Sequence, residues 1–489
     1  MIDNGFGRPG EPILGPMTNI KEMDALIARS NGQLREPEWP QADVIIGNPP
    51  FLGGNRIRAE LGNVYVEDLF ELYKGHVPAF ADLVCYWFEK ACEQIASGKA
   101  ERAGLLATNS IRGGVNRRVL ERIKENGDIF FAESDRPWIL NGAAVRVSMV
   151  GFHDGSEEIE KRLDGVPVER INADLTGDLD LSAAQRLKEN MDLCFYGSQQ
   201  KGSFDIVPAK AEELLAEPNS FGLDTKKVVK PAINAAQLLR RAPETWVIDF
   251  GIAMPLEEAA LYEAPFEYVK QVVYPERRNR SEKRQREYWW LHARPSPRYR
   301  TILASQTRYI ASPAVSKHRI FVWLDGHVLA DHALVVFAFE DDYSFGVLHS
   351  RVHELWAVRM GTFLGVGNDP RYTPTSTFET FPFPWPPGEE PSGDERIEVI
   401  AEAARRLDEL RRNWLNPEGA TEAELKKRTL TNLYNARPTW LENAHAELDR
   451  AVFAAYGWSE DPDELSEEEL LKRLLDLNTQ RSKASDQPT

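Results

Sequence analysis

Asp43-Val-Ile-Ile-Gly-Asn48-Pro49-Pro50-Phe51 is the stretch around which the rest of the sequence is organised. Val44, Ile45 and Ile46 form a short apolar, β-branched run, which predicts a buried strand. The glycine and two prolines that follow end this strand, because proline lacks an N–H and keeps the preceding residue out of helix. The sequence therefore predicts a rigid turn at the carboxyl end of a strand, where open α/β sheets place their ligands.

The side chains of this turn suit a planar base that carries an exocyclic amine. The amide oxygen of Asn48 and the backbone carbonyl at Pro49 can accept the two N–H bonds, and Phe51 offers a ring face for stacking. A plain loop after a strand is the alternative interpretation of the same residues.

The sequence resembles the amino-methylating DNA methyltransferases, whose mark is a strand followed by Asn-Pro-Pro-Phe or Asn-Pro-Pro-Tyr. It is most similar to the MmeI-like type II restriction–modification family. The similar segments are Asp43–Phe51 with Leu52-Gly53-Gly54, Ala81–Lys90, Tyr372-Thr-Pro-Thr, Phe378–Phe383 and the C-terminal helical region, which together span almost the whole chain. The resemblance implies that Asn48, Pro49, Pro50 and Phe51 are catalytic in methyl transfer from S-adenosyl-L-methionine. The expected target is the amine of a flipped adenine in double-stranded DNA, with the amine of cytosine as the alternative.

The same resemblance assigns three further residues. Asp24 best matches an aspartate that contacts the adenine ring of the cofactor, although a solvated Asp24 is the alternative. Asp82 matches a position that lines the cofactor pocket, and it opens a predicted helix, where a carboxylate also serves as a cap. Trp138 matches a second aromatic that stacks on the flipped base, with a simple core tryptophan as the alternative.

The glycine turn that holds the cofactor in this family, of the Phe-x-Gly-x-Gly kind, lies upstream of Asn-Pro-Pro-Phe and is not found here. Gly5-Phe-Gly7-Arg-Pro-Gly10 has Gly-x-Gly-x-x-Gly spacing, but no strand precedes it and Pro9 stands where a helix should open. We therefore expect residues 1–42 to be a lead-in and a separate polypeptide to carry the missing half of the domain. A catalytically inactive DNA specificity module, or a truncated methyltransferase, is the alternative. No Pro-Asp…Glu-x-Lys nuclease core is evident, so we expect no cleavage.

Composition limits the class of protein. The chain has 59 Lys and Arg against 76 Asp and Glu, a formal net charge of −17, which argues against a sequence-independent DNA coat. Three cysteines in 489 residues make neither a disulfide framework nor a zinc site, and we expect no metal. Because the sequence has no long apolar run and no signal pattern, we expect a soluble, cytoplasmic protein that does not contact membranes.

The expected fold class is α/β. A partial Rossmann-like methyltransferase domain (43–160) is followed by an α+β target recognition domain (161–385) and a C-terminal helical region (386–489). In the first domain, hydrophobic periodicity predicts helices over 79–97 and 116–126 and strands over 103–109 and 143–152.

A basic segment between Glu276 and Arg300 carries nine Lys and Arg against three Glu in an otherwise acidic chain. Tyr288, Trp289, Trp290 and Tyr299 are interleaved with these charges. A solvated surface is the usual interpretation of such a run, but the aromatics and the methyltransferase turn favour DNA contact. The predicted DNA-binding residues are Arg277, Arg278, Arg280, Lys283, Arg284 and Arg286, together with Lys317 and Arg319 from a smaller basic site.

Overall fold

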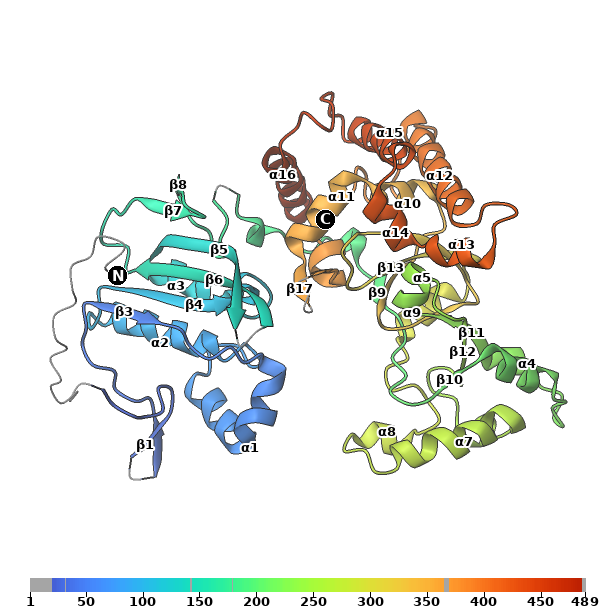
Figure 1. Cartoon of the computed structure of the whole chain (residues 1–489), viewed down its shortest axis with the longest axis horizontal. Coiled ribbons are helices and arrows are strands. Elements are labelled where there is room, and N and C mark those ends of the chain that lie inside the picture. The colour runs from blue at the N-terminus through green and yellow to red at the C-terminus, as the bar shows by residue number, and fades with distance from the viewer. Residues whose placement is uncertain (1–19, 31, 141–142, 178, 365–368, 486–489) are drawn as a thin grey trace. The chain divides into compact units, whose positions relative to one another are not determined.

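A computed structural model describes residues 20–30, 32–140, 143–177, 179–364 and 369–485 (Figure 1). The glycine pattern at 5–10 lies outside these residues. The chain divides into two compact units, Met1–Asp178 and Leu179–Thr489, and each is described on its own. None of the helices in the described ranges combines the length and apolarity needed to cross a membrane.

The first unit is built on a six-stranded sheet of order β3-β4-β6-β5-β7-β8. β4 pairs in parallel with β3 and antiparallel with β6, and β5 is antiparallel to β6. It follows that β3, β4 and β5 run in one direction and end at the same edge of the sheet. The elements of this unit are β1 (Ala28–Ser30), β2 (Gln33–Arg35), β3 (Val44–Gly47), α1 (Gly54–Leu72), α2 (Val84–Ala96), β4 (Arg102–Thr108), α3 (Arg117–Asn126), β5 (Asp128–Leu140), β6 (Ala143–His153), β7 (Lys161–Leu163) and β8 (Val166–Val168).

Helices α2 and α3 contact each other, and they contact β4 and β5 respectively, so that they cover one face of the sheet (Figure 1). Their inward side chains, such as Phe88 and Leu120, share a core with Leu105 of β4. The predicted helix 116–126 and strands 103–109 and 143–152 are confirmed as α3, β4 and β6. The helix predicted over 79–97 is present as α2, but it begins only at Val84. The expected α/β class is confirmed with them.

The predicted strand at residues 44–46 is present as β3, but the prediction that it is buried is wrong. Ile45 packs against the core, whereas Val44 is 45% exposed and Ile46 is 85% exposed. The physical reason is the position of β3 at the end of the strand order, where the described residues cover one face only. Because successive side chains alternate between faces, every second one points away from that cover.

The second unit contains two four-stranded sheets, of order β10-β12-β11-β15 and β14-β13-β16-β9, and a small β17–β18 pair. Its strands are β9 (Cys194–Tyr196), β10 (Asp205–Ile206), β11 (Val229–Ile233), β12 (Thr245–Ile248), β13 (Arg308–Pro313), β14 (Val322–Asp325), β15 (Leu329–Ala330), β16 (Leu334–Phe337), β17 (Thr362–Leu364) and β18 (Asp369–Arg371). Its helices are α4 (Pro208–Ala216), α5 (Ala235–Arg240), α6 (Leu256–Ala259), α7 (Glu263–Arg277), α8 (Lys283–Glu287), α9 (Pro297–Leu303), α10 (Asp342–His349), α11 (Arg351–Met360), α12 (Glu395–Leu415), α13 (Glu422–Lys427), α14 (Leu430–Ala436), α15 (Thr439–Ala455) and α16 (Glu467–Ser485).

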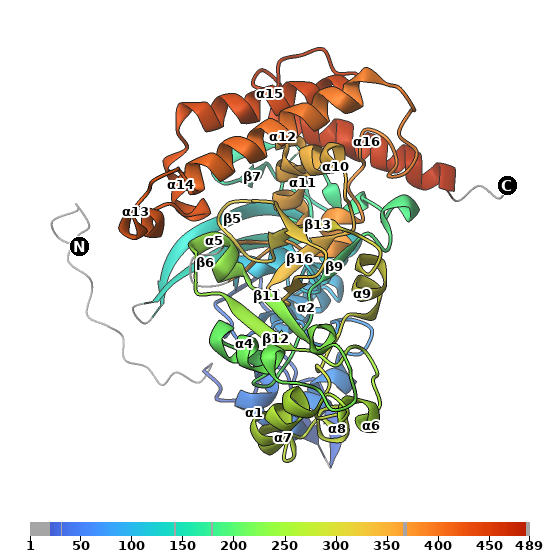
Figure 2. The same ribbon diagram turned by 90° about the vertical axis from the view of Figure 1, so that its right-hand side faces the viewer.

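The boundaries between units differ from the expected ones. β7 begins at Lys161 and pairs with β5, so the hydrogen bonds of the first sheet continue past the expected boundary at 160 and the first unit ends at Asp178. In the second unit, helices α12 and α15 lie side by side (Figures 1 and 2) and share one core with α10, α11 and β16. The residues after 385 therefore pack as part of the second unit, because their apolar faces are buried against it.

Candidate active site

The turn after β3 presents its polar group to solvent. β3 ends at Gly47, as the two prolines require, and Asn48 and Pro50 are exposed while Pro49 is buried and Phe51 is half-buried. Pro49 thus anchors the turn, and the Asn48 amide is accessible. The arrangement leaves room for an approaching base, which a corner sealed among apolar side chains would not.

Asp82 holds the far end of this turn. Its Oδ1 accepts a hydrogen bond from the Gly54 N–H at 3.0 Å, and its Oδ2 accepts one from the Ser110 hydroxyl at 2.7 Å. The Asp82 N–H donates in turn to Oδ1 of Asn116 at 2.8 Å. Sequence reasoning singled out neither Ser110 nor Asn116, although Ser110 lies in the turn after β4, as Asn48 lies in the turn after β3.

Close backbone packing strengthens the clamp formed by the hydrogen bonds of Asp82 to Gly54, Ser110 and Asn116. The Leu83 N–H donates to the Leu52 carbonyl at 2.8 Å, and a Cβ at Gly54 would meet the Phe80 carbonyl oxygen at 1.9 Å, so that only glycine fits there. Asp82 therefore connects the turn after β3 with the turn after β4. Because both carboxylate oxygens are engaged, this role is better supported by the geometry than direct contact with a cofactor.

Asp82→Ala is expected to loosen the turn and to lower the stability of the first unit by about 1–3 kcal/mol, because the Gly54 N–H and the Ser110 hydroxyl lose their acceptor. Hydrogen exchange of the amides at 52–56 should speed up in the absence of cofactor. Unchanged exchange and stability would instead indicate a residue that only contacts the cofactor. Asp43→Ala, at an exposed aspartate before β3, is the control.

Asp24 lies in a turn beside α1. Its Oδ1 accepts hydrogen bonds from the backbone N–H groups of Leu26 and Ile27 at 2.8 and 3.0 Å, and from the Tyr65 hydroxyl at 3.3 Å. Burial and the Asp24 carboxylate raise the pKa of Tyr65 above its ordinary value, so the phenol stays protonated and remains a donor. Asp24 is exposed to solvent, but these hydrogen bonds orient its carboxylate, and its contact with a cofactor stays a prediction.

Trp138 is part of β5 and is exposed, so it is not a core tryptophan in this structure. Trp138 pairs with Val145 of β6. The last residue of β4, Thr108, pairs with Val147, so Trp138 pairs with β6 two residues past the end of β4. The ring therefore belongs to the part of the β5–β6 hairpin that extends past the sheet edge where Asn48 lies. β5 is three strand positions from β3, roughly 14 Å at the usual spacing, so stacking opposite Phe51 requires the hairpin to curve toward the turn.

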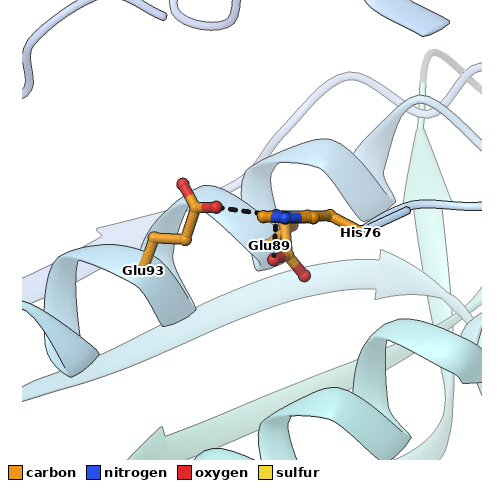
Figure 3. A group of neighbouring side chains, drawn as sticks. All are labelled: His76, Glu89 and Glu93. Atoms are coloured by element: carbon orange, nitrogen blue, oxygen red, sulfur yellow. Dashed lines mark hydrogen bonds and ion pairs between the residues drawn. The ribbon is translucent and has the colours of Figure 1, made fainter. Parts of the chain in front are cut away.

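One group in the first unit has the composition of a metal site (Figure 3). His76 Nδ1 lies 2.9 Å from Glu93 Oε1 and 3.2 Å from Glu89 Oε1. However, both carboxylate oxygens of the buried Glu89 already accept hydrogen bonds from the Arg122 guanidinium at 2.8–3.2 Å. We interpret the group as an ion-pair network that joins α2 and α3, and assign no metal to it.

Two residues of the predicted DNA-binding set are buried in the second unit. Arg277 is 0% exposed, its guanidinium donates to the carbonyls of Gln200, Lys201, Trp289 and Leu291, and it lies over the ring of Phe204. Arg319 donates to the carbonyls of Pro313 and Pro370. Their placement is incompatible with phosphate contact, and the prediction is wrong for these two because their charges satisfy backbone carbonyls.

The other predicted residues form an exposed basic patch around α8, which consists of Arg278, Arg280, Lys283, Arg284 and Arg286, with Lys317 exposed elsewhere in the unit. Of the interleaved aromatics, Tyr288 is 44% exposed, with Arg284 over its ring, whereas Trp290 and Tyr299 are buried. The structure thus brings five of the predicted cations together with the exposed ring of Tyr288, while Trp289 is half-buried.

The first unit matches a known domain in sequence. Residues 15–163 match the family model described as MmeI, DNA-methyltransferase domain. The matched range contains the Asn48 turn, Asp24, Asp82 and Trp138, and it therefore includes all of the predicted catalytic and cofactor-binding residues.

The fold comparison extends over both units. A solved structure described as the type IIL restriction-modification enzyme MmeI in complex with DNA matches with a TM-score of 0.69 and 21% identity, covering 90% of this chain and 57% of that one. The chain thus spans little more than half the length of that enzyme. The type IIG restriction endonuclease BpuSI gives a TM-score of 0.25 at 13% identity over 85% of this chain and 54% of that one, too weak to indicate a shared fold. No curated protein matches significantly.

Proposed function

We propose that the chain contributes the catalytic turn and the DNA-recognition part of a site-specific DNA methyltransferase that modifies the exocyclic amine of a flipped adenine. The observation that carries this proposal is the accessible Asn48 amide at the carboxyl end of β3 within the range of the MmeI methyltransferase model. The exposed basic patch around α8 is the proposed contact with double-stranded DNA, by neutralisation of phosphates.

The turn acts by orienting the amine. The lone pair of the exocyclic nitrogen is delocalised into the ring, so the amine is a poor nucleophile. Acceptance of its two N–H bonds by the Asn48 amide and the Pro49 carbonyl pulls it toward a tetrahedral form, and Phe51 supports the ring. S-adenosyl-L-methionine, when bound, supplies the methyl group. Positioning then does most of the work, and the turn needs no strong general base.

The residues present fit only part of a cofactor site. Asp24 is held ready beside Tyr65, but the carboxylate of Asp82 is engaged with Gly54 and Ser110. The exposed face of β3, with Ile46 85% exposed, supports the proposal that further polypeptide covers this strand and completes the cofactor site. A β-branched strand of this composition is normally buried, and extra strands join sheets at such ends.

Calorimetric titration with S-adenosyl-L-methionine tests this proposal. We expect no binding to the chain alone and binding once a polypeptide carrying a Phe-x-Gly-x-Gly turn is added. Ile46→Lys should abolish cofactor binding by the mixture, because it places a charge in the contact between β3 and the added polypeptide. Val166→Lys is the control, since Val166 is exposed on β8 at the opposite end of the sheet, and it should leave cofactor binding unchanged. Absence of binding in every mixture, with DNA binding intact, would favour an inactive specificity module.

A further inference from the structure

A cavity of about 640 Å³ lies within the second unit, beside the parallel strands β11 and β15. It is open to solvent on one side and is lined by Leu215 of α4, Tyr299 and Arg300 of α9, and the turn from Gly326 to Val328. Its volume falls in the range of about 300–1,000 Å³ that is usual for small-molecule pockets. Neither the basic patch nor the Asn48 turn contributes to its walls.

One wall of the cavity is flat. Pro231 of β11 and Trp246 of β12 are directly opposite each other in the antiparallel register, so that their rings lie side by side on one face of the sheet. A flat, largely apolar wall that includes an indole ring favours a planar occupant, because ring faces stack best on one another.

The polar part of the lining is basic. Lys226, Lys230 and Arg300 line the cavity together with His327, and none of the described residues that line it is acidic. In a chain of net charge −17, such a set would exclude cations and attract an anionic group. The remaining lining is apolar, which suits a ligand with a ring at one end and a negative charge at the other.

A buried carboxylate fixes two of these cations at the cavity. Asp249 is 1% exposed, and its Oδ2 pairs with Arg300 Nη1 at 2.5 Å and with Lys230 Nζ at 3.2 Å. Burial lowers the pKa of the adjacent His292 to about 4, so this side chain adds no charge. Lys230 and Arg300 together carry two positive charges, and Asp249 carries one negative charge. The net charge of this group is therefore +1, and its ion pairs hold the two cations in place for a ligand.

We propose that this cavity binds a nucleoside monophosphate, with the base against Trp246 and Pro231 and the phosphate at Lys226, Lys230 and Arg300. The nucleotide is either a free mononucleotide or a unit of a DNA strand that is held outside the helix. The chemistry recognised is the same in both cases. The proposal does not depend on methyl transfer.

Calorimetric titration of the full chain with AMP tests whether the cavity binds a free mononucleotide. We expect binding, with adenosine roughly tenfold weaker because it lacks the charge that pairs with the cations. Lys226→Gln should weaken AMP binding by a similar factor. Lys227→Gln is the matched control, since Lys227 is an exposed neighbour outside the cavity lining. Quenching of fluorescence that disappears in Trp246→Phe would place the base at the proposed wall.

If the bound nucleotide is instead part of a DNA strand, the binding results should differ. AMP alone would then fail to bind, but a duplex with one unpaired adenine nucleotide would bind more tightly than the fully paired duplex, and Lys226→Gln would remove that advantage while Lys227→Gln would not. The proposal is overturned if neither AMP nor the unpaired nucleotide shows such binding, or if both lysine variants behave alike. Since no cofactor enters these measurements, failure here leaves the proposed methyl transfer undecided.

Discussion

Asn48→Ala is expected to abolish methyl transfer, with a loss of at least about 10²–10³-fold in rate, while DNA binding stays close to that of the unchanged chain. The amide is exposed at the end of β3, so its removal disturbs little packing. It would, however, remove one of the two acceptors that orient the amine, and a preorganised polar contact of this kind is worth that much in catalysis. Transfer of a labelled methyl group in the cofactor-competent assembly and a gel-shift titration measure the two effects separately.

Asn63→Ala provides the matched control, because Asn63 is an exposed asparagine of α1 outside the turn. It should retain methyl transfer. Asn48→Asp is informative as well, since it keeps the size of the side chain and its acceptor oxygen while adding charge. Equal loss of DNA binding and methyl transfer in Asn48→Ala would contradict the assigned role and point to a structural function of the turn.

Arg277→Ala and Arg278→Ala are expected to affect different properties, although the residues are adjacent. The first should lower the stability of the second unit, and the second should weaken DNA binding. Removal of the buried Arg277 leaves four backbone carbonyls without their donor and should destabilise the second unit by about 3–4 kcal/mol. Arg278 is exposed, so its removal should change stability by less than about 0.5 kcal/mol. Instead it should weaken DNA binding evenly across sequences and reduce the salt slope by about one.

Urea unfolding and salt-dependent DNA binding measure the two outcomes. Glu276→Gln would not serve as a control, because Glu276 accepts hydrogen bonds from Ser203. Lys270→Ala, on an exposed turn of α7 away from α8, is better suited and should affect neither quantity strongly. A stable Arg277→Ala variant with weakened DNA binding would show that the arginine leaves its buried position to contact DNA.

The local elements of the first unit could be predicted because their patterns are local. The periodicity of Leu83 to Ile95 and of Val119 to Ile123 requires one buried face on a helix, and α2 and α3 provide it. β5 was not predicted, since Asp135, Arg136 and Pro137 interrupt its apolar residues. Pairing with β6 on one side and β7 on the other supplies the hydrogen bonds that make this segment a strand.

The candidate site was predictable at the turn and less so around it. Pro49 and Pro50 end β3 by a property of proline itself, so the exposed corner at Asn48 follows from sequence. The clamp by Asp82, Ser110 and Asn116 joins residues up to 34 positions apart and needs the fold to bring them together.

Local sequence was sufficient to predict the Asn-Pro-Pro-Phe turn at the end of a strand, the helices that flank the sheet, and the concentration of positive charge between 276 and 300. Which of those charges face solvent depends instead on how the chain packs. Arg277 and Arg278 have the same side chain and nearly the same sequence context, yet one satisfies buried carbonyls and the other lies at the surface. Burial depends on which segments pack together, and that is fixed by contacts between residues far apart in the chain rather than by the residues beside them.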